Sequence, residues 1–210
     1  RVSAGLMAAA PAAVAAYAPE IVLHAAHAGP NYHQAMMWLP YLQQTGLRTM
    51  VLTRYPGPSR ALRDRVGDVP LVQATELTDL DAMMVDSVKA VFYPNAKVGN
   101  NSVIRRHPWV RHVFVNHGDS DKSTAAAPSH AVYDLIFAAG PAAVRRYADH
   151  GVVIAPEKFE VVGRPQAGGV RQADRPVGEV ASPTVLYAPT WKGFTTETSI
   201  SSLSMGVAIV

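Results

Sequence analysis

The chain has 210 residues, of which 49% are hydrophobic and 17% are charged, and this composition is ordinary for a globular protein with a sizeable buried core. It contains no cysteine, which excludes disulfides and thiolate metal sites. The formal net charge of +3 comes without a dense block of Lys and Arg, so nucleic-acid binding is not expected. Basic pairs such as Arg145 and Arg146 are interpreted as solvated helix faces, with contact to a phosphate-bearing ligand as the alternative.

Residues 1–19 are rich in alanine, and residues 2–19 carry no charged side chain. Alanine is only weakly apolar, and Pro11 and Pro19 interrupt the segment, so we predict a helix or connector instead of a membrane span. A signal peptide is not expected, because a charged leader and a cleavage context are not evident. The chain begins with Arg1 instead of Met and ends inside a helical pattern over residues 199–210, so we expect it to be part of a longer protein.

Short runs of β-branched and apolar residues alternate with helical segments from residue 20 onward. Strands are predicted at residues 21–23, 49–53, 69–72, 90–93, 113–115, 135–138 and 159–162. Helices are predicted at residues 33–45, with a kink at Pro40, and at 60–66, 101–107 and 141–150. Because the strand runs are apolar on both faces, we expect an α/β fold over residues 20–163, with a Rossmann-like parallel sheet covered by helices on both faces.

Residues 164–183 lose this alternation and are rich in Gly, Pro, Arg, Gln and Asp, as an interdomain linker would be. A further strand is predicted at residues 185–188. We therefore expect residues 184–210 to be the start of a second, Rossmann-like domain.

The densest group of polar residues follows the predicted strand 113–115. Ligands of parallel sheets bind outside the carboxyl ends of the strands, so this loop is predicted to handle a phosphate group. His117 has an ordinary pKa near neutrality and suits a general base acting on an alcohol, although a merely hydrogen-bonded loop histidine is the alternative. The loop residues predicted to bind substrate are Asn116, Gly118, Asp119, Ser120, Asp121, Lys122 and Ser123.

Two patterns in the sequence raise the question of a metal site. Asp119 and Asp121 flank one serine and can share a hard cation such as Mg²⁺, but Lys122 competes for their carboxylates. His24 and His27 lie in a predicted strand, where their spacing does not suit one metal ion, so they are interpreted as core or surface histidines. No metal cofactor is expected, and a divalent ion at the aspartates remains the alternative.

Three further segments carry candidate ligand-binding residues. Arg164, after the last predicted strand, either forms part of a hinge or clamps a phosphate with two hydrogen bonds. Asn31 lies in the loop after the first strand, which should share the sheet edge of His117 and shape an acceptor pocket. The segment after the predicted strand 185–188 is either a turn with a packed Trp or one wall of a nucleotide or polyol-phosphate cleft; its candidate donor-binding residues are Pro189, Thr190, Trp191 and Lys192.

The order and spacing of three segments resemble those of the CDP-glycerol glycerophosphotransferases. Residues 115–122 (VNHGDSDK) are similar to the family's strand-His-Gly-loop-Lys motif, residues 162–165 (VGRP) to its Gly-x-Pro exit, and residues 186–191 (LYAPTW) to its Tyr-Ala-Pro-Thr-Trp segment. The resemblance implies a GT-B architecture, in which an N-terminal domain binds the acceptor and a C-terminal domain binds a CDP-alcohol donor. The family's essential histidine corresponds to His117.

The activity implied by this resemblance is the transfer of glycerol phosphate, or a related polyol phosphate, from the CDP-alcohol to a teichoic-acid-like polymer of a bacterial cell wall. The implied acceptor is a lipid-linked or polymeric glycan or polyol phosphate, so the protein is expected in the cytoplasm, bound peripherally to the inner membrane surface. Two alternatives remain. One is a GT-B nucleotide-sugar glycosyltransferase or epimerase, and the other is a non-catalytic module that binds glycans or membranes.

Overall fold

The computed structural model describes residues 4–27, 32–189 and 201–209. The chain forms two compact units, Arg1–Gly168 and Gly169–Val210. The first unit contains the sheet and all the helices that cover it, and it is the part that positions the candidate site.

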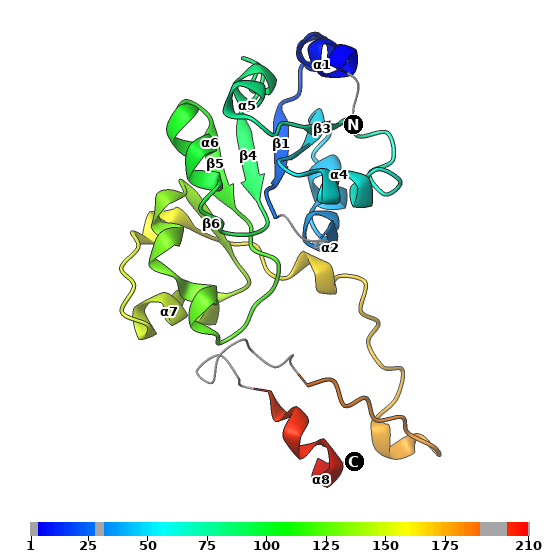
Figure 1. Cartoon of the computed structure of the whole chain (residues 1–210). Coiled ribbons are helices and arrows are strands. Elements are labelled where there is room, and N and C mark those ends of the chain that lie inside the picture. The colour runs from blue at the N-terminus through cyan, green and yellow to red at the C-terminus, as the bar shows by residue number, and fades with distance from the viewer. Residues whose placement is uncertain (1–3, 28–31, 190–200, 210) are drawn as a thin grey trace. The chain divides into compact units, whose positions relative to one another are not determined.

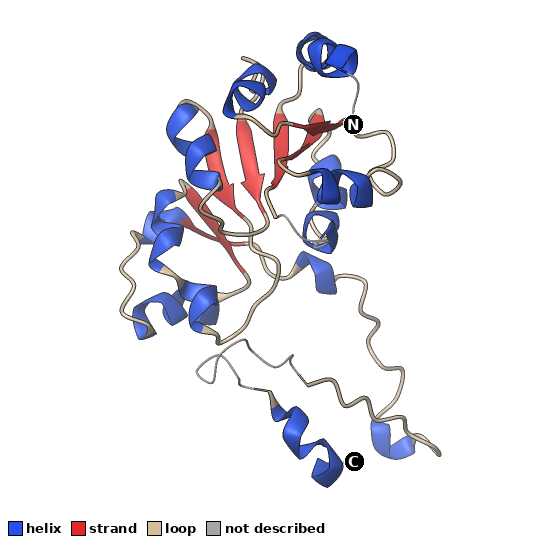
Figure 2. Cartoon of the chain, viewed as in Figure 1, coloured by secondary structure: helices blue, strands red, loops and turns tan. Residues whose placement is uncertain are grey.

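The first unit is built on a seven-stranded parallel sheet with the order β3-β2-β1-β4-β5-β6-β7 (Figures 1 and 2). On the interior strand β1, Val22 pairs with Met50 of β2 on one side and with Val91 of β4 on the other. This arrangement confirms the α/β, Rossmann-like fold and the parallel pairing expected from the sequence. The strands are β1 Ile21–Ala25, β2 Thr49–Thr53, β3 Leu71–Gln73, β4 Ala90–Tyr93, β5 Arg111–Phe114, β6 Leu135–Ala138 and β7 Phe159–Val161.

Helices cover both faces of the sheet, and each face has its own apolar core (Figure 2). One face is covered by α2 Tyr32–Met36, α3 Leu39–Gln43 and α4 Pro56–Leu62. The opposite face carries α1 Ala4–Tyr17, α5 Leu77–Met83, α6 Asn100–Arg106 and α7 Pro141–Asp149. Short 3₁₀ turns lie at Ser123–Ala126, Pro128–Val132, Pro156–Lys158 and Pro165–Ala167. Strands that are apolar on both sides are therefore needed to fill both layers.

Proline and acidic caps set the helix boundaries where they differ from the sequence prediction. The predicted helix 33–45 is two helices, and the second has Pro40 in its first turn, where a missing N–H costs nothing. α4 begins at Pro56 and not at residue 60 for the same reason. α5 was not predicted; its start is marked by Glu76, whose backbone N–H donates to the Asp79 carboxylate at 3.1 Å.

The N-terminal segment forms α1, as predicted, and packs beside α5. Val14 is buried in the core, and the Tyr17 hydroxyl donates to the Thr49 carbonyl at 3.1 Å. In the described part of the chain, no helix combines the length and the apolar character that crossing a bilayer requires.

The second unit does not contain the strand predicted at residues 185–188. Val185 and Leu186 are 88% and 85% exposed, and the described residues of this unit hold no strand with which the segment could pair. A β-propensity run without a hydrogen-bonded neighbour stays irregular. The described elements here are the 3₁₀ turns Val177–Glu179 and Ser202–Met205 and the short helix α8 Gly206–Ile209.

Candidate functional site

The carboxyl ends of β1 and β4 form a crevice at the centre of the sheet. The chain leaves β1 toward α2 on one face and leaves β4 toward α6 on the other, so the two connections diverge. Such a switch point is where open α/β sheets bind ligands. A pocket of about 240 Å³, including its opening to solvent, lies here and is lined in part by His27, Tyr32, Gln34, Pro58, Pro94 and Asn95.

His117 is held in one orientation by Pro94, one of the residues that line this pocket. Its Nδ1 lies 2.7 Å from the carbonyl oxygen of Pro94, the residue that follows β4. A carbonyl can only accept a hydrogen bond, so Nδ1 carries the proton and Nε2 keeps its lone pair. An imidazole fixed in this tautomer has the form that a general base needs.

A left-handed backbone at Asn116 aims His117 at Pro94. Asn116 has φ of 58°, a left-handed conformation that asparagine adopts more readily than most residues because its side chain can hydrogen-bond locally. Trp38 Nε1 donates to the Asn116 carbonyl at 2.6 Å, and the Asn116 side-chain oxygen accepts from the His117 backbone N–H at 2.8 Å. Trp38 is itself buried against Phe137, so packing holds the left-handed turn in place.

The surroundings of His117 favour its neutral form. Partial burial of the ring lowers the pKa of His117 below its ordinary value of 6.5, and the positive charge of Lys97 and the nearby His33 and His27 act in the same direction. The hydrogen bond to Pro94 opposes this shift without reversing it. The sequence suggests only the ordinary pKa of an imidazole, because it does not show the burial of the ring, which is the main cause that lowers the pKa of His117.

In the second half of the same loop, Asp119 and Asp121 form ion pairs with one arginine. Arg146 of α7 donates from Nη1 to Asp119 at 2.5 Å and from Nε to Asp121 at 2.9 Å. The Arg146 side chain is only 13% exposed, so its interpretation as part of a solvated helix face is wrong. Among the described residues, no three His, Asp or Glu side chains gather as a metal site would require.

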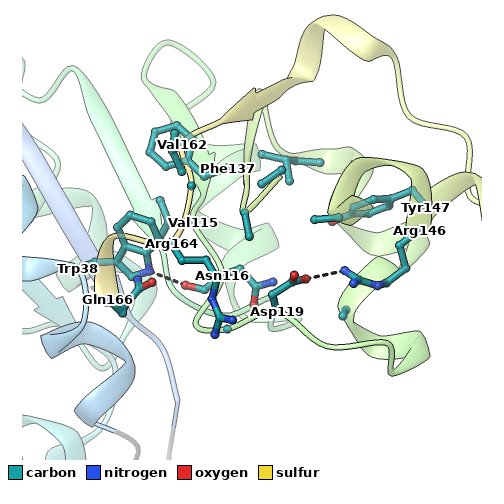
Figure 3. A pocket seen from close by; sticks show the side chains of 17 residues that line it. Trp38, Val115, Asn116, Asp119, Phe137, Arg146, Tyr147, Val162, Arg164 and Gln166 are labelled. Carbon is teal, nitrogen blue, oxygen red and sulfur yellow. Dashed lines mark hydrogen bonds and ion pairs between the residues drawn. The ribbon is translucent and has the colours of Figure 1, made fainter. Parts of the chain in front are cut away.

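A larger hollow lies beside this ion pair, over the ends of β5, β6 and β7 (Figure 3). It measures about 510 Å³ including its opening to solvent, and the predicted residues Asn116, Gly118, Asp119 and Arg164 line it. Figure 3 shows Asn116 and Asp119 between Trp38, which bonds the former, and Arg146, which pairs with the latter.

The remaining residues of the predicted loop lie outside the hollow's lining. Ser120 and Asp121 are exposed, Lys122 is half-buried, and Ser123 is exposed at the start of a 3₁₀ turn. The structure thus brings four of the predicted substrate-binding residues together in the lining of the hollow and leaves these four outside it.

The chain leaves the sheet through a bend that is tied to α3. Gly163 has φ of 76°, a left-handed value that glycine adopts without strain, and the Tyr41 hydroxyl donates to the Pro165 carbonyl. Arg164 is exposed and lies on the rim of the hollow, so both hypotheses for this residue, hinge and phosphate clamp, remain.

Several predicted positions give no structural test. Asn31, Thr190, Trp191 and Lys192 lie outside the described residues. Pro189 is described, half-buried in an irregular part of the second unit. The donor-binding prediction therefore stays a prediction.

The partners that organise the site were not found by sequence reasoning. Trp38, Pro94 and Arg146 bond the 116–121 loop from 78, 23 and 25–27 positions away. No local pattern marks such pairs, because only the fold brings them together. His24, in contrast, is a buried core histidine as interpreted, and burial lowers its pKa to about 3.

Comparisons with known proteins add no relative: no family model matches the chain, and no curated protein matches it. The functional case therefore depends on the geometry at the switch point and on the motifs in the sequence.

Proposed function

We propose that this chain is the acceptor-side part of a bacterial transferase that moves glycerol phosphate, or a related polyol phosphate, from a CDP-alcohol to a polyol-phosphate polymer. The observation that carries the proposal is the fixed tautomer of His117, whose Nδ1 bonds the Pro94 carbonyl at 2.7 Å beside the switch-point crevice. The nature of the donor comes from the resemblance of residues 115–122, 162–165 and 186–191 to the CDP-glycerol glycerophosphotransferases.

The proposed step is a displacement at the β-phosphorus of the CDP-alcohol. The acceptor hydroxyl oxygen forms a new bond to this phosphorus, the bond to the bridging oxygen breaks, and CMP leaves. His117 Nε2 accepts the hydroxyl proton, for which its lowered pKa keeps it neutral at pH 7.

In this proposal Asp119 and Asp121 position the loop and do not bind a metal. Both carboxylates are held by Arg146, which ties the loop to α7 at a fixed distance from β5. The left-handed turn at Asn116 then has a fixed point on each side, Trp38 before His117 and Arg146 after it. Such rigid support is what a general base requires of its surroundings.

The proposal extends to the place of action. A lipid-linked acceptor would bring the protein to the inner membrane surface, and the net charge of +3 favours contact with anionic lipids. Washing isolated membranes with high salt or at alkaline pH should release the protein; retention until detergent is added would contradict a peripheral association.

The decisive experiment measures CMP release from CDP-glycerol by the intact protein in the presence of a glycerol-phosphate acceptor. His117→Ala should lower turnover by about 10²–10⁴-fold, the range for loss of a general base, while its Tm stays close to that of wild type. The matched control is His150→Ala, because His150 is exposed and its ring bonds the backbone carbonyl of Arg146 in the preceding helix α7, away from the His117 ring. A His117→Ala protein that turns over within a few-fold of wild type would remove His117 from the mechanism.

The same assay separates the alternatives. Release of UDP from a UDP-hexose, with no CMP from CDP-glycerol, would assign the chain to nucleotide-sugar transfer. Binding of anionic glycans without release of either nucleotide would indicate a non-catalytic module.

A further inference from the structure

Helix α7 is attached to the rest of the first unit by few buried side chains. Of its nine residues, only Ala143 and Tyr147 are buried. The Tyr147 ring packs on Phe159 of β7 at a centroid distance of 5.1 Å, and its hydroxyl lies 2.8 Å from Nδ1 of His130. The attachment of α7 therefore depends largely on what surrounds one tyrosine.

His130 is itself buried and has no ion-pair partner. It lies in the 3₁₀ turn Pro128–Val132, is 2% exposed, and packs on the ring of Phe114 in β5 at a centroid distance of 4.3 Å. The titratable side chain on the same face of β5 is His112, which is buried as well. Among the described residues no carboxylate pairs with the His130 ring, and burial lowers the pKa of His130 to about 4.

The other titratable groups around His130 come from α7, from its own turn and from the start of β7. Burial raises the pKa of Tyr147 to about 12, so its hydroxyl is neutral wherever a histidine titrates. Tyr133, which follows the turn, also has its pKa raised by burial. Lys158 donates from Nζ to the carbonyls of Ala131 and Tyr133. A positive charge on His130 would thus lie beside the turn that already holds an ammonium group.

Protonation of His130 is therefore unfavourable while α7 stays in place. A doubly protonated ring can only donate from Nδ1, so the Tyr147 hydroxyl would have to accept and to turn its own proton away. Opening of α7 lets water reach the ring and returns the pKa of His130 toward its ordinary 6.5. Because the open form binds the proton more tightly, a fall in pH from 6.5 toward about 4 favours opening.

An opening of α7 reaches the candidate site through the residue before Tyr147. Arg146 forms the ion pairs with Asp119 and Asp121 that hold the loop after β5. Figure 3 shows the side chains of Arg146 and Tyr147 projecting from the same helix into the lining of the hollow. When α7 moves away, Arg146 moves with it, and the loop loses its support on that side.

We propose that the His130–Tyr147 contact is an acid-sensitive latch, in which protonation of His130 releases α7 and the loop after β5 that Arg146 anchors. The latch is closed at neutral pH, and acidification opens it in a growing fraction of molecules. It acts on the order of this loop and does not depend on the transferase activity proposed above.

The test is amide hydrogen exchange of the 210-residue chain, followed by NMR at pH 7.5 and 5.0 and corrected for intrinsic exchange rates. Carboxylates ordinarily titrate near pH 4, so this window isolates histidines. The opening constant at residues 144–148 should rise about 30-fold on acidification, the value for one group with these two pKa values. The Nε–H of Arg146, which bonds Asp121, should lose protection in parallel. No rise, or α7 amides that open only together with those of β1, would overturn the latch.

Three variants separate the proton from the hydrogen bond. His130→Gln keeps a partner for Tyr147 and removes the titrating group, so the opening constant should change by less than about threefold between the two pH values. Tyr147→Phe removes the bond and keeps the histidine, so α7 should open about 2–10-fold more at both pH values and retain the rise. His150→Ala, at an exposed histidine just after α7, is the matched control and should also retain it. A full rise in His130→Gln excludes the latch.

Direct titration of the wild-type chain covers the case in which His130→Gln does not fold. The ring C–H signals of His130 should shift with a midpoint below about 5, because the closed form resists the proton. A midpoint near 6.5 while the α7 amides stay protected would show that the closed form accepts the proton, and the latch would be excluded.

Discussion

The loop that follows β5 has two polar halves, one around His117 and one around Asp119 and Asp121, and their side chains have different bonding partners. In the first half, His117 bonds a neutral carbonyl and keeps a lone pair for chemistry. In the second half, the two aspartates both form ion pairs with one arginine from α7. The difference lies in what the fold brings to each half, a backbone oxygen in one case and a guanidinium in the other.

This contrast shows that a sequence dense in polar residues does not reveal which of their side chains remain free to bind a ligand. His117 and Asp119 are two residues apart and look equally suited to a ligand. The bonding partner decides whether a side chain can still bind a ligand. The carbonyl bonded to His117 orients the ring and leaves one ring nitrogen free, whereas the ion pair with Arg146 occupies the carboxylate of Asp119. We therefore expect substitutions in the first half to affect turnover and substitutions in the second half to affect stability.

The largest effect after loss of His117 itself is expected for Trp38→Phe. The change removes the N–H that holds the Asn116 carbonyl, so the left-handed turn relaxes and His117 moves. A displacement of about 1 Å can lower turnover by about 10²-fold. Phe137→Leu is the control, because it loosens packing against Trp38 and leaves the hydrogen bond in place. CMP-release kinetics that are equally impaired in both variants would contradict this role.

A smaller and different effect is expected for Arg146→Met. Breaking its pairs with Asp119 and Asp121 should lower the free energy of unfolding by about 1–3 kcal/mol, between the values for exposed and buried pairs. Turnover should fall only a few-fold. Arg145→Met, at the exposed neighbouring arginine, should stay within about 0.5 kcal/mol of wild type in urea denaturation. Equal free energies of unfolding for the two variants would contradict the expectation that the second half of the loop after β5 contributes to stability.

The smallest effect concerns pH. A general base works when unprotonated, so activity should rise with pH through the pKa of His117, and the half-maximal point should lie below 6.5. Lys97 helps to lower that pKa, so Lys97→Gln should move the half-maximal point toward higher pH and change activity at pH 7 by less than about twofold. If the half-maximal point of the rise in wild-type turnover with pH lies above 6.5, another group is titrating.

Much of the fold could be predicted from the sequence because its signals are local. The runs at 49–53, 90–93 and 135–138 are strands with the predicted bounds, since a strand buried on both faces needs continuous apolar residues. The error at 185–188 has the same origin. A run such as Val185–Ala188 shows that a segment can form a strand, but not that a neighbouring strand is present to pair with it.

Only part of the candidate site could be predicted from the sequence. His117 and Gly118 could be found because they follow an apolar strand, where parallel sheets place their ligands. Trp38 and Arg146 could not, because they bond the loop after β5 from 78 and 25–27 positions away and no local pattern marks them.

The sheet topology also affects how the chain can fold while it is being synthesised. β1, buried along its whole length, receives its second neighbour only when β4 emerges, and Lys89 reaches back across 69 positions to Glu20 just beside that pairing. Parallel partners need such long crossovers, which slow folding. Until residue 93 has left the ribosome, the nascent chain holds an apolar strand with one unpaired edge, the kind of edge that templates aggregation. A strand that is buried along its whole length in the folded protein is thus exposed along one edge during synthesis.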